Sequence, residues 1–457
     1  MASNLPEISI AQLLAKQIAV LDPAQLPAAV RTKCEELLID VWGLCFTARN
    51  EDYVRATLAA CDDDGPCTAV GHARGLSAAA AALVNGTAIH GEDFDDTFEG
   101  GPVHAGTAIV PAVLAACERH NPDGKSALLG VAVGVEVMCR LGLVTPKLVH
   151  KAGFHPTAVF GAMAAAAGVA AALRLSERQI VDALGIAGSM ASGIIEYLAE
   201  GAWTKRMHGG WAAQSGIRAA LMAKNGFTGP RTVFEGTHGF FHGFANTTEG
   251  KYDLLTGDFG SKWVSETLAF KLYPCGTMTH PYIDCARRLA ARGVKADDIK
   301  EMICEVGEGT VHRLWETLAD KQRPPNGYGA KFSTPYCIAA GFIRGNVGLD
   351  SFTDEAVKDP AVLAVAGKVR YVIDPKNPYP DNFTGHIRAA MKDGSVIEER
   401  QPYMRGGAHE PLTRKDIEEK FALCCRHGGW GDARIAVALK LAHMLYDGRV
   451  DLAALRG

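Results

Sequence analysis

The sequence predicts a mainly α-helical protein, with a large all-helical domain and a smaller α+β lid domain. Three observations support this fold class. The first 270 or so residues carry helix-period patterns rich in Ala and Gly, strand and hairpin signals begin after Lys271, and helical patterns return from Thr413. We therefore expect a helical domain from residues 1–268 and 410–457, interrupted by a lid domain over residues 269–409.

In the first part, apolar residues recur at helical spacing and several runs carry start signals. Ser176, for example, stands three residues before Gln179, which fits a capping box. The Ala- and Gly-rich middle runs favour close helix packing. The expected helices cover 10–20, 24–46, 53–61, 77–93, 107–119, 126–143, 157–173, 176–188 and 210–224.

The second part mixes strands with helices. A hairpin is expected to turn at Asp393-Gly394, because this dipeptide stands between two alternating runs. Strands are also expected over 303–306 and 369–373, with helices over 284–292, 334–344, 416–425 and 433–445.

The composition is that of a globular protein with 48% hydrophobic and 21% charged residues. A net charge of −4 without a basic block argues against nucleic acid as a partner. The apolar run Thr157–Leu173 is mostly Ala and Gly, which suits helix packing better than a membrane span. Twelve cysteines without CxxC pairs are typical of reduced thiols, and the start of the chain lacks signal-peptide features, so we expect a cytoplasmic enzyme.

The stretch from His90 to His104 is the most informative motif, because it gathers five carboxylates between two histidines. Like charges this close repel unless cations, hydrogen bonds or protonation relieve them. If the stretch continues a helix, His90, Asp93 and Thr97 share one face. A solvated helix end is the plainest interpretation, although apolar segments on both sides suggest that the stretch is enclosed.

Two functional interpretations compete. Asp95, Asp96 and Glu99 have the DDxxE spacing of helical enzymes that bind diphosphates through magnesium. Such enzymes need a second acidic helix facing the first, and the sequence shows none.

The other interpretation is acid–base chemistry on a small polyacid. Basic and imidazole side chains stand among apolar residues around Phe154-His155-Pro156, Lys205–His208 and Lys271–His280. Fixed cations and donors in a partly dry cavity are what a carboxylate-rich substrate requires.

At these residues the chain resembles the MmgE/PrpD family. The resemblance is carried by HGEDFDDT, GFHPTAVFGAMAAAAG, WTKRMHGGWAAQSG, FKLYPCGTMTHPYID and KFSTPYCIA, in this order. It implies an all-α domain with an α+β lid, a homodimer, no metal or organic cofactor, and a small polycarboxylate substrate. The implied activities are 2-methylcitrate dehydratase, cis-aconitate decarboxylase and iminodisuccinate epimerase.

The resemblance also transfers residues. Asp93, His104, Lys205 and Lys271 are expected to be catalytic. The expected substrate-binding residues are Thr97, His155 and Tyr336, although Tyr336 is open to a packing interpretation. Cys275 and Cys337 are expected to be small buried hydrophobes rather than nucleophiles.

All three activities share the making or protonation of a carbanion next to a carboxylate. His104 is the preferred acid/base because histidine titrates near neutral pH, with Asp93 orienting it or taking part. Lys205, Lys271 and His155 are expected to offset charge on the carboxylates. We expect a lyase, with dehydration ahead of decarboxylation and an epimerase as the alternative.

Overall fold

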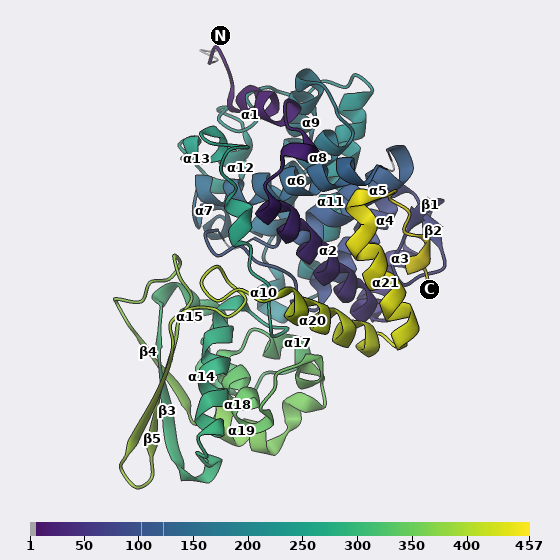
Figure 1. Ribbon diagram of the computed structural model, residues 1–457. Coiled ribbons are helices and arrows are strands. Elements are labelled where there is room, and N and C mark those ends of the chain that lie inside the picture. The colour runs from purple at the N-terminus through teal and green to yellow at the C-terminus, as the bar shows by residue number, and fades with distance from the viewer. Residues whose placement is uncertain (1–5, 102, 122) are drawn as a thin grey trace. The chain divides into compact units, whose positions relative to one another are not determined.

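The computed structural model describes residues 6–101, 103–121 and 123–457, and they form two compact units. Unit 1 comprises Met1–Gly91, Asp95–Leu268 and Thr413–Gly457, and unit 2 comprises Glu92–Phe94 and Ala269–Leu412. Most of the regular structure is helical (Figure 1), so the mainly α fold class is confirmed.

Unit 1 is a helical assembly with one small hairpin. Its helices are α1 (Ile10–Ala19), α2 (Ala28–Ala48), α3 (Asp52–Ala59), α4 (Ala78–Gly91), α5 (Ala105–His120), α6 (Gly124–Val144), α7 (Leu148–Lys151), α8 (Pro156–Ala172), α9 (Glu177–Met190), α10 (Tyr197–Glu200), α11 (Thr204–Lys224), α12 (Phe240–Ala245), α13 (Asp253–Thr256), α20 (Arg414–His427) and α21 (Asp432–Met444). The antiparallel strands β1 (Asp64–Thr68) and β2 (Gly75–Leu76) pair with each other. Helix α20, from the end of the chain, packs against α2, and both helices are labelled in Figure 1.

Small residues bring the central helices of unit 1 together, as the Ala- and Gly-rich pattern predicts. Helix α11 packs against α4, α5, α8 and α9. A Cβ atom added to Gly86 of α4 would lie 2.5 Å from Cα of Gly210 in α11. A Cβ atom on Gly216 would lie 2.4 Å from Cβ of Ala165 in α8. Any larger side chain at these crossings would separate the helices that carry the histidines described below.

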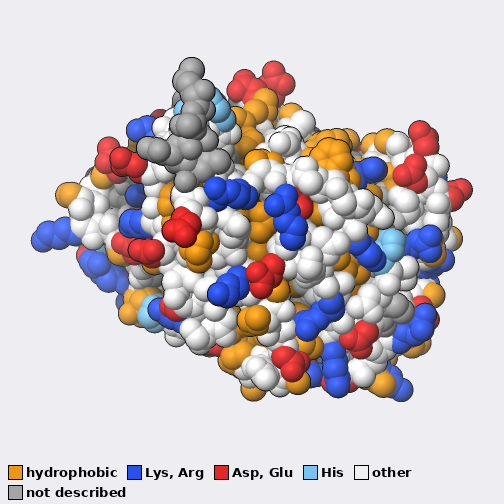
Figure 2. Space-filling view, turned by 90° about the horizontal axis from the view of Figure 1, so that it is seen from above, with side chains coloured by type: hydrophobic (Ala, Val, Ile, Leu, Met, Phe, Trp, Pro, Cys, Tyr) orange, Lys and Arg blue, Asp and Glu red, His pale blue; other side chains and the backbone are white. Residues whose placement is uncertain are grey.

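Helix α6 is long and apolar enough to span a bilayer by length and composition alone, but 94% of its apolar window is buried inside the protein. A core helix of a globular domain passes the same test. Over the face drawn in Figure 2, Lys and Arg side chains are interspersed with Asp and Glu, in keeping with the net charge of −4.

Unit 2 combines a mixed four-stranded sheet with helices. The strands are β3 (Ile299–Val306), β4 (Val369–Ile373), β5 (Gly385–Met391) and β6 (Val396–Gln401), in the order β4-β3-β5-β6. Strand β4 is parallel to β3, whereas β5 is antiparallel to both β3 and β6. The helices are α14 (His280–Ala291), α15 (Val311–Leu314), α16 (Leu318–Gln322), α17 (Gly327–Ala330), α18 (Thr334–Arg344) and α19 (Pro360–Ala366).

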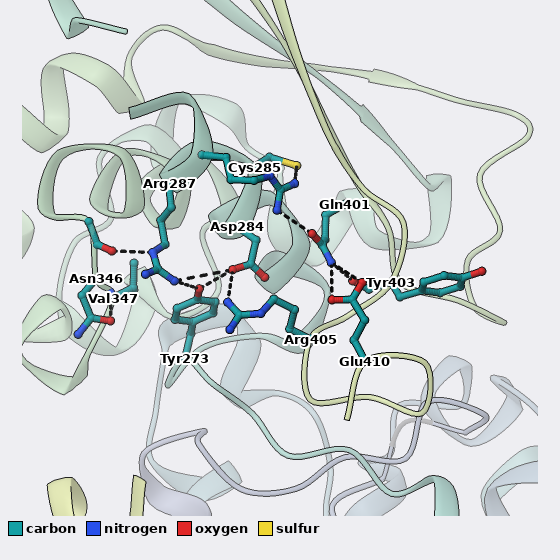
Figure 3. A network of polar contacts seen from close by, with 12 residues as sticks. Tyr273, Asp284, Cys285, Arg287, Asn346, Val347, Gln401, Tyr403, Arg405 and Glu410 are labelled. Atoms are coloured by element: carbon teal, nitrogen blue, oxygen red, sulfur yellow. Dashed lines mark hydrogen bonds and ion pairs between the residues drawn. The ribbon is translucent and has the colours of Figure 1, made fainter. Parts of the chain in front are cut away.

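A polar network around the buried carboxylate of Asp284 anchors the segment that leads into α14 (Figure 3). The carboxylate of Asp284 accepts hydrogen bonds from the Tyr273 hydroxyl at 2.7 Å and from Arg405 at 3.1 Å. Arg287 also donates to the Tyr273 hydroxyl, at 2.7 Å. Burial, and the nearby Asp284 carboxylate, raise the pKa of Tyr273 well above its usual value, so the phenol stays a donor. The network fixes the backbone two residues after Lys271.

Candidate active site

Helix α4 ends earlier than the sequence pattern predicts, and this changes the interpretation of the acidic stretch. The helix stops at Gly91, and Asp93 has φ +53°, a left-handed conformation that a helix cannot continue through. The prediction that His90, Asp93 and Thr97 share one helical face is therefore wrong. The residues after Gly91 form a loop instead, and Glu92, Asp93, Asp95 and Asp96 each have a different partner.

His90 and Asp95 form a buried pair in unit 1. Nδ1 of His90 lies 2.6 Å from Oδ2 of Asp95, and both side chains are 0% exposed. A carboxylate accepts, so His90 carries a proton on Nδ1. Nε2 of His90 is buried and has no hydrogen-bond partner among the described residues.

His104 stands at the start of α5, where Asp96 completes the helix end. His104 is the N-cap residue of α5, but its own side chain makes no capping hydrogen bond. The carboxylate of Asp96, from the preceding loop, accepts the backbone N–H groups of Ala105 and Gly106 instead, both at 2.8 Å. Burial and the neighbouring Asp95 raise the pKa of Asp96 to about 8, while the two N–H donors oppose the rise.

The same loop fixes the imidazole of His104. Its Nδ1 lies 2.6 Å from the carbonyl oxygen of Asp96, and 3.9 Å from Oδ1 of Asp95. A carbonyl oxygen only accepts, so Nδ1 carries the hydrogen. When the ring is neutral, Nε2 is therefore the nitrogen with the lone pair, which is the arrangement a general base requires.

His155 and His208 add two more rings to this group. His155 precedes Pro156 at the start of α8, and His208 lies in α11; their Nδ1 atoms are 3.1 Å apart. The His155 ring stacks on His90 with centroids 5.5 Å apart, and the centroid of His104 is 5.3 Å from that of His90. We call His90, His104, His155 and His208 the histidine cluster.

Burial keeps two of these imidazoles neutral. It lowers the pKa of His155 well below the usual 6.5, and His208, His90, Lys205 and His104 act in the same direction. Burial also lowers the pKa of His208 to about 3, helped by His90 and Lys205. Neutral rings can hydrogen-bond in both senses without adding charge to the site.

Lys205 and Thr97 lie in the same unit as the histidine cluster. Lys205 is buried, one turn before His208 on α11, and its charge acts on both His155 and His208. Thr97 is fully buried, and its hydroxyl has no hydrogen-bond partner within the described ranges. Lys205 therefore places a positive charge near two imidazoles of the histidine cluster, which suits an anionic ligand.

In unit 2, two buried lysines hold the segment Glu92–Phe94. Nζ of Lys271 lies 2.7 Å from Oδ1 and 3.1 Å from the carbonyl oxygen of Asp93. Nζ of Lys331 lies 2.8 Å from Oε2 and 2.7 Å from the carbonyl oxygen of Glu92. Each lysine therefore neutralises one carboxylate and fixes one backbone carbonyl, which explains why the repulsion in the acidic stretch is tolerated.

Tyr336 and Cys337 lie in α18, and Cys275 also belongs to unit 2. The Tyr336 hydroxyl donates to the carbonyl oxygen of Ser351 at 2.7 Å, and burial raises its pKa to about 12. This contact favours the packing interpretation. Cys275 and Cys337 are both buried, as predicted, and Sγ of Cys275 lies 3.0 Å from the Thr279 hydroxyl oxygen.

The structure thus groups the predicted residues in two sets. His104, His155, Lys205 and Thr97 belong to unit 1. Asp93, Lys271 and Tyr336 belong to unit 2, where Asp93 and Lys271 are paired with each other.

Four residues that the structure makes prominent were not among the predicted catalytic or substrate-binding residues, namely His90, Asp95, His208 and Lys331. His90 and Asp95 were considered only as parts of the helix-face and metal patterns. The signal for His208 was its position three residues after Lys205, since this spacing places both side chains on one helical face.

The DDxxE interpretation finds little support in the geometry. Asp95 is engaged by His90, and Asp96 by the start of α5. Among the residues that the structure describes, no group of three or more His, Cys, Asp or Glu side chains is arranged to hold a metal ion.

Two protein-family models together match most of the chain. The MmgE/PrpD N-terminal domain matches residues 12–253, and the MmgE/PrpD C-terminal domain matches residues 273–452. The chain belongs to the MmgE/PrpD family.

Individual relatives refine this picture. A cis-aconitate decarboxylase-like protein of Aspergillus oryzae is 27% identical over 443 residues, covering 92% of this chain and 91% of the relative. Human cis-aconitate decarboxylase is 30% identical over 356 residues, covering 75% and 71%. The mitochondrial 2-methylcitrate dehydratase of Yarrowia lipolytica is 26% identical over 256 residues, covering 52% and 47%.

Proposed function

We propose that this protein is a lyase acting on a small tricarboxylate, and that decarboxylation of cis-aconitate or a close analogue is its first candidate reaction. A relative named cis-aconitate decarboxylase matches over 75% of the chain and one named cis-aconitate decarboxylase-like over 92%, whereas the relative named 2-methylcitrate dehydratase matches over 52%. This coverage favours decarboxylation ahead of dehydration, the reverse of the order expected from the sequence alone.

The observation that carries the proposal is the fixed tautomer of His104. Its Nδ1–H is held by the Asp96 carbonyl oxygen, so that Nε2 accepts or delivers the proton. A proton exchanged at a carbon next to a carboxylate is the step that decarboxylation and dehydration share. A positioned acid or base of this kind contributes about 10²–10⁴-fold to the rate.

The substrate carboxylates require donors and positive charge. We assign this role to His155, Lys205 and Thr97, which are buried with His104 in unit 1. Burial excludes water and strengthens each such interaction. The catalytic roles of Asp93 and Lys271 remain predictions from the family resemblance, and their mutual ion pair gives them a structural role as well.

The proposal extends to catalysis without a metal or organic cofactor, to a homodimer and to a cytoplasmic location. Each rests on the family resemblance and the sequence features given above. Light scattering of the purified protein measures the oligomeric state, and a monomer would contradict that part.

The test is turnover with cis-aconitate, 2-methylcitrate and citrate, followed by CO₂ release and by NMR of the products. We expect CO₂ from cis-aconitate and a loss of about 10²–10⁴-fold in kcat/KM for His104→Ala, with the unfolding midpoint little changed. The matched control is His120→Ala, at the exposed opposite end of the same helix.

Three outcomes would contradict the proposal in different ways. Near-wild-type turnover by His104→Ala removes its acid/base role. Water loss without CO₂ release makes the enzyme a dehydratase. Hydrogen–deuterium exchange or inversion in an iminodisuccinate-like dicarboxylate, without either lyase product, identifies an epimerase.

A further inference from the structure

We propose that His208 is a positioning residue that donates its Nδ1 hydrogen to Nδ1 of His155, so that His155 presents Nε2–H to a substrate carboxylate. This inference rests on the proposed function for the nature of the ligand. It assigns His208 a role that neither the sequence motifs nor the family comparison supplied.

The geometry limits the pair to two arrangements. The two Nδ1 atoms are 3.1 Å apart, so one ring donates and the other accepts. If His155 donates, its Nε2 holds a lone pair; if His155 accepts, its Nε2 carries a hydrogen. The hydrogen bond thus determines what the far edge of the His155 ring offers to a ligand.

The hydrogen bond exists only if at least one ring is neutral, since two charged rings would both be donors. The surroundings of the pair favour the neutral form of both rings. His155 is buried against His90, His104, His208 and Tyr197, with centroid distances of 5.2–6.4 Å. The Lys205 charge disfavours a further positive charge on either ring, and burial lowers both pKa values.

The backbone around the pair is also fixed. The N–H of His155 donates to the carbonyl oxygen of Gly193 at 2.8 Å. Gly193 has φ +126°, and a Cβ atom there would lie 2.4 Å from Cβ of Ala158 and 3.4 Å from Nε2 of His208. The loop therefore packs closely on α8 at Ala158 and lies next to the His208 ring, so the backbone at His155 is held by both a hydrogen bond and packing.

The direction follows from the charge of the ligand. A carboxylate is an acceptor, so a lone pair on Nε2 of His155 would repel it, whereas Nε2–H would donate to it. Lys205 supplies positive charge in the same unit, but this charge does not decide which nitrogen of His155 carries the hydrogen. A donor at His155 therefore requires that His208 supply the shared hydrogen.

The first test reads the tautomers directly and needs no substrate. The full-length protein is labelled with ¹⁵N-histidine, and the ring-nitrogen resonances are assigned by their loss in His155→Asn and His208→Asn. At pH 7.5 we expect His155 to be protonated on Nε2 only, and His208 on Nδ1. A hydrogen on Nδ1 of His155, or a positively charged His155, would overturn the inference.

The second test separates positioning from general structure. His208→Leu removes the donor, and we expect KM for the tricarboxylate to rise at least 10-fold while kcat changes less than threefold. Asparagine places an amide donor near the position of Nδ1, so His208→Asn should return KM to within about threefold of the wild-type value. The control is His120→Leu, which should change neither constant.

The two tests fail separately. If no polycarboxylate is turned over, the proposed function fails, and the NMR result still decides the direction of the hydrogen bond. If turnover is found but both His208 variants have wild-type KM values, the positioning role is refuted while the proposed function stands.

Discussion

The buried histidine pair predicts a specific loss of stability in acid. The perturbation is a fall in pH from 7.5 to 5. In the unfolded chain a histidine has a pKa near 6.5, whereas burial lowers that of His208 to about 3 and that of His155 well below 6.5. A depressed pKa contributes stability that is present above pH 6.5 and is lost as the pH falls, because only the unfolded chain takes up the proton.

The magnitude follows from the proton uptake of the unfolded chain. At pH 5 a histidine with a pKa of 6.5 is almost fully protonated, and the linked free energy is about 2 kcal/mol for each group that stays neutral in the fold. His208 should therefore lower the free energy of unfolding by roughly 2 kcal/mol between pH 7.5 and 5. His155, whose pKa is also lowered by burial, should add to this loss in the same direction.

The assay is urea unfolding followed by far-ultraviolet circular dichroism at several pH values. His208→Asn should reduce the acid-dependent loss by about 2 kcal/mol, whatever its effect at pH 7.5. His242→Asn, on an exposed part of unit 1, is the matched control and should leave the slope unchanged. An identical slope in wild type, His208→Asn and the control would refute the reasoning that these rings are held neutral by burial.

Four further outcomes are expected. Asp96→Ala leaves two buried N–H donors of α5 without an acceptor and should lower the free energy of unfolding by about 1–2 kcal/mol. The effect should exceed that of Asp123→Ala at the exposed start of α6, and equal effects of the two variants in thermal unfolding would contradict the capping role. Lys331→Met leaves the Glu92 carboxylate without its counter-ion and should lower the free energy of unfolding, measured in urea, by about 3 kcal/mol. Adding Glu92→Gln should recover part of this loss, and no recovery in the double variant would argue against the ion pair. Tyr336→Phe should cost about 1 kcal/mol with kcat/KM nearly unchanged, and a 10-fold drop in kcat/KM would restore its predicted substrate role. Thorough metal chelation should leave turnover unchanged, whereas activity that is lost and regained with Mg²⁺ would revive the metal interpretation.

Much of the secondary structure could be predicted because the local signals were strong. The capping box at Ser176 is present, the helix Thr334–Arg344 and the strand Val369–Ile373 have the expected bounds, and Gly394 turns the hairpin with φ +88°. In each case the propensity of the local residues agrees with the surrounding packing.

The acidic stretch could not be read in this way, since its conformation depends on distant residues. Helical periodicity placed His90, Asp93 and Thr97 on one face, but Lys271 binds both the carboxylate and the carbonyl oxygen of Asp93. Such a contact spans 178 positions in the chain and leaves no periodic signal. Lys331 was hidden for the same reason.

The histidine cluster was partly predictable. The motifs identified His104 and His155 through resemblance, and the Lys205–His208 spacing was visible in the sequence. The hydrogen-bond partners that fix each tautomer were not visible, because a backbone carbonyl such as that of Asp96 has no sequence signature.

The assignment of Glu92–Phe94 to unit 2 has a consequence for recombining family members. A chimera that exchanges only residues 269–412 would combine the lysines of another family member with the native segment Glu92–Phe94. Deleting residues 269–412 would remove Lys271 and Lys331, which are the counter-ions of Asp93 and Glu92. The transferable module is discontinuous: the three-residue loop has to travel with the larger segment.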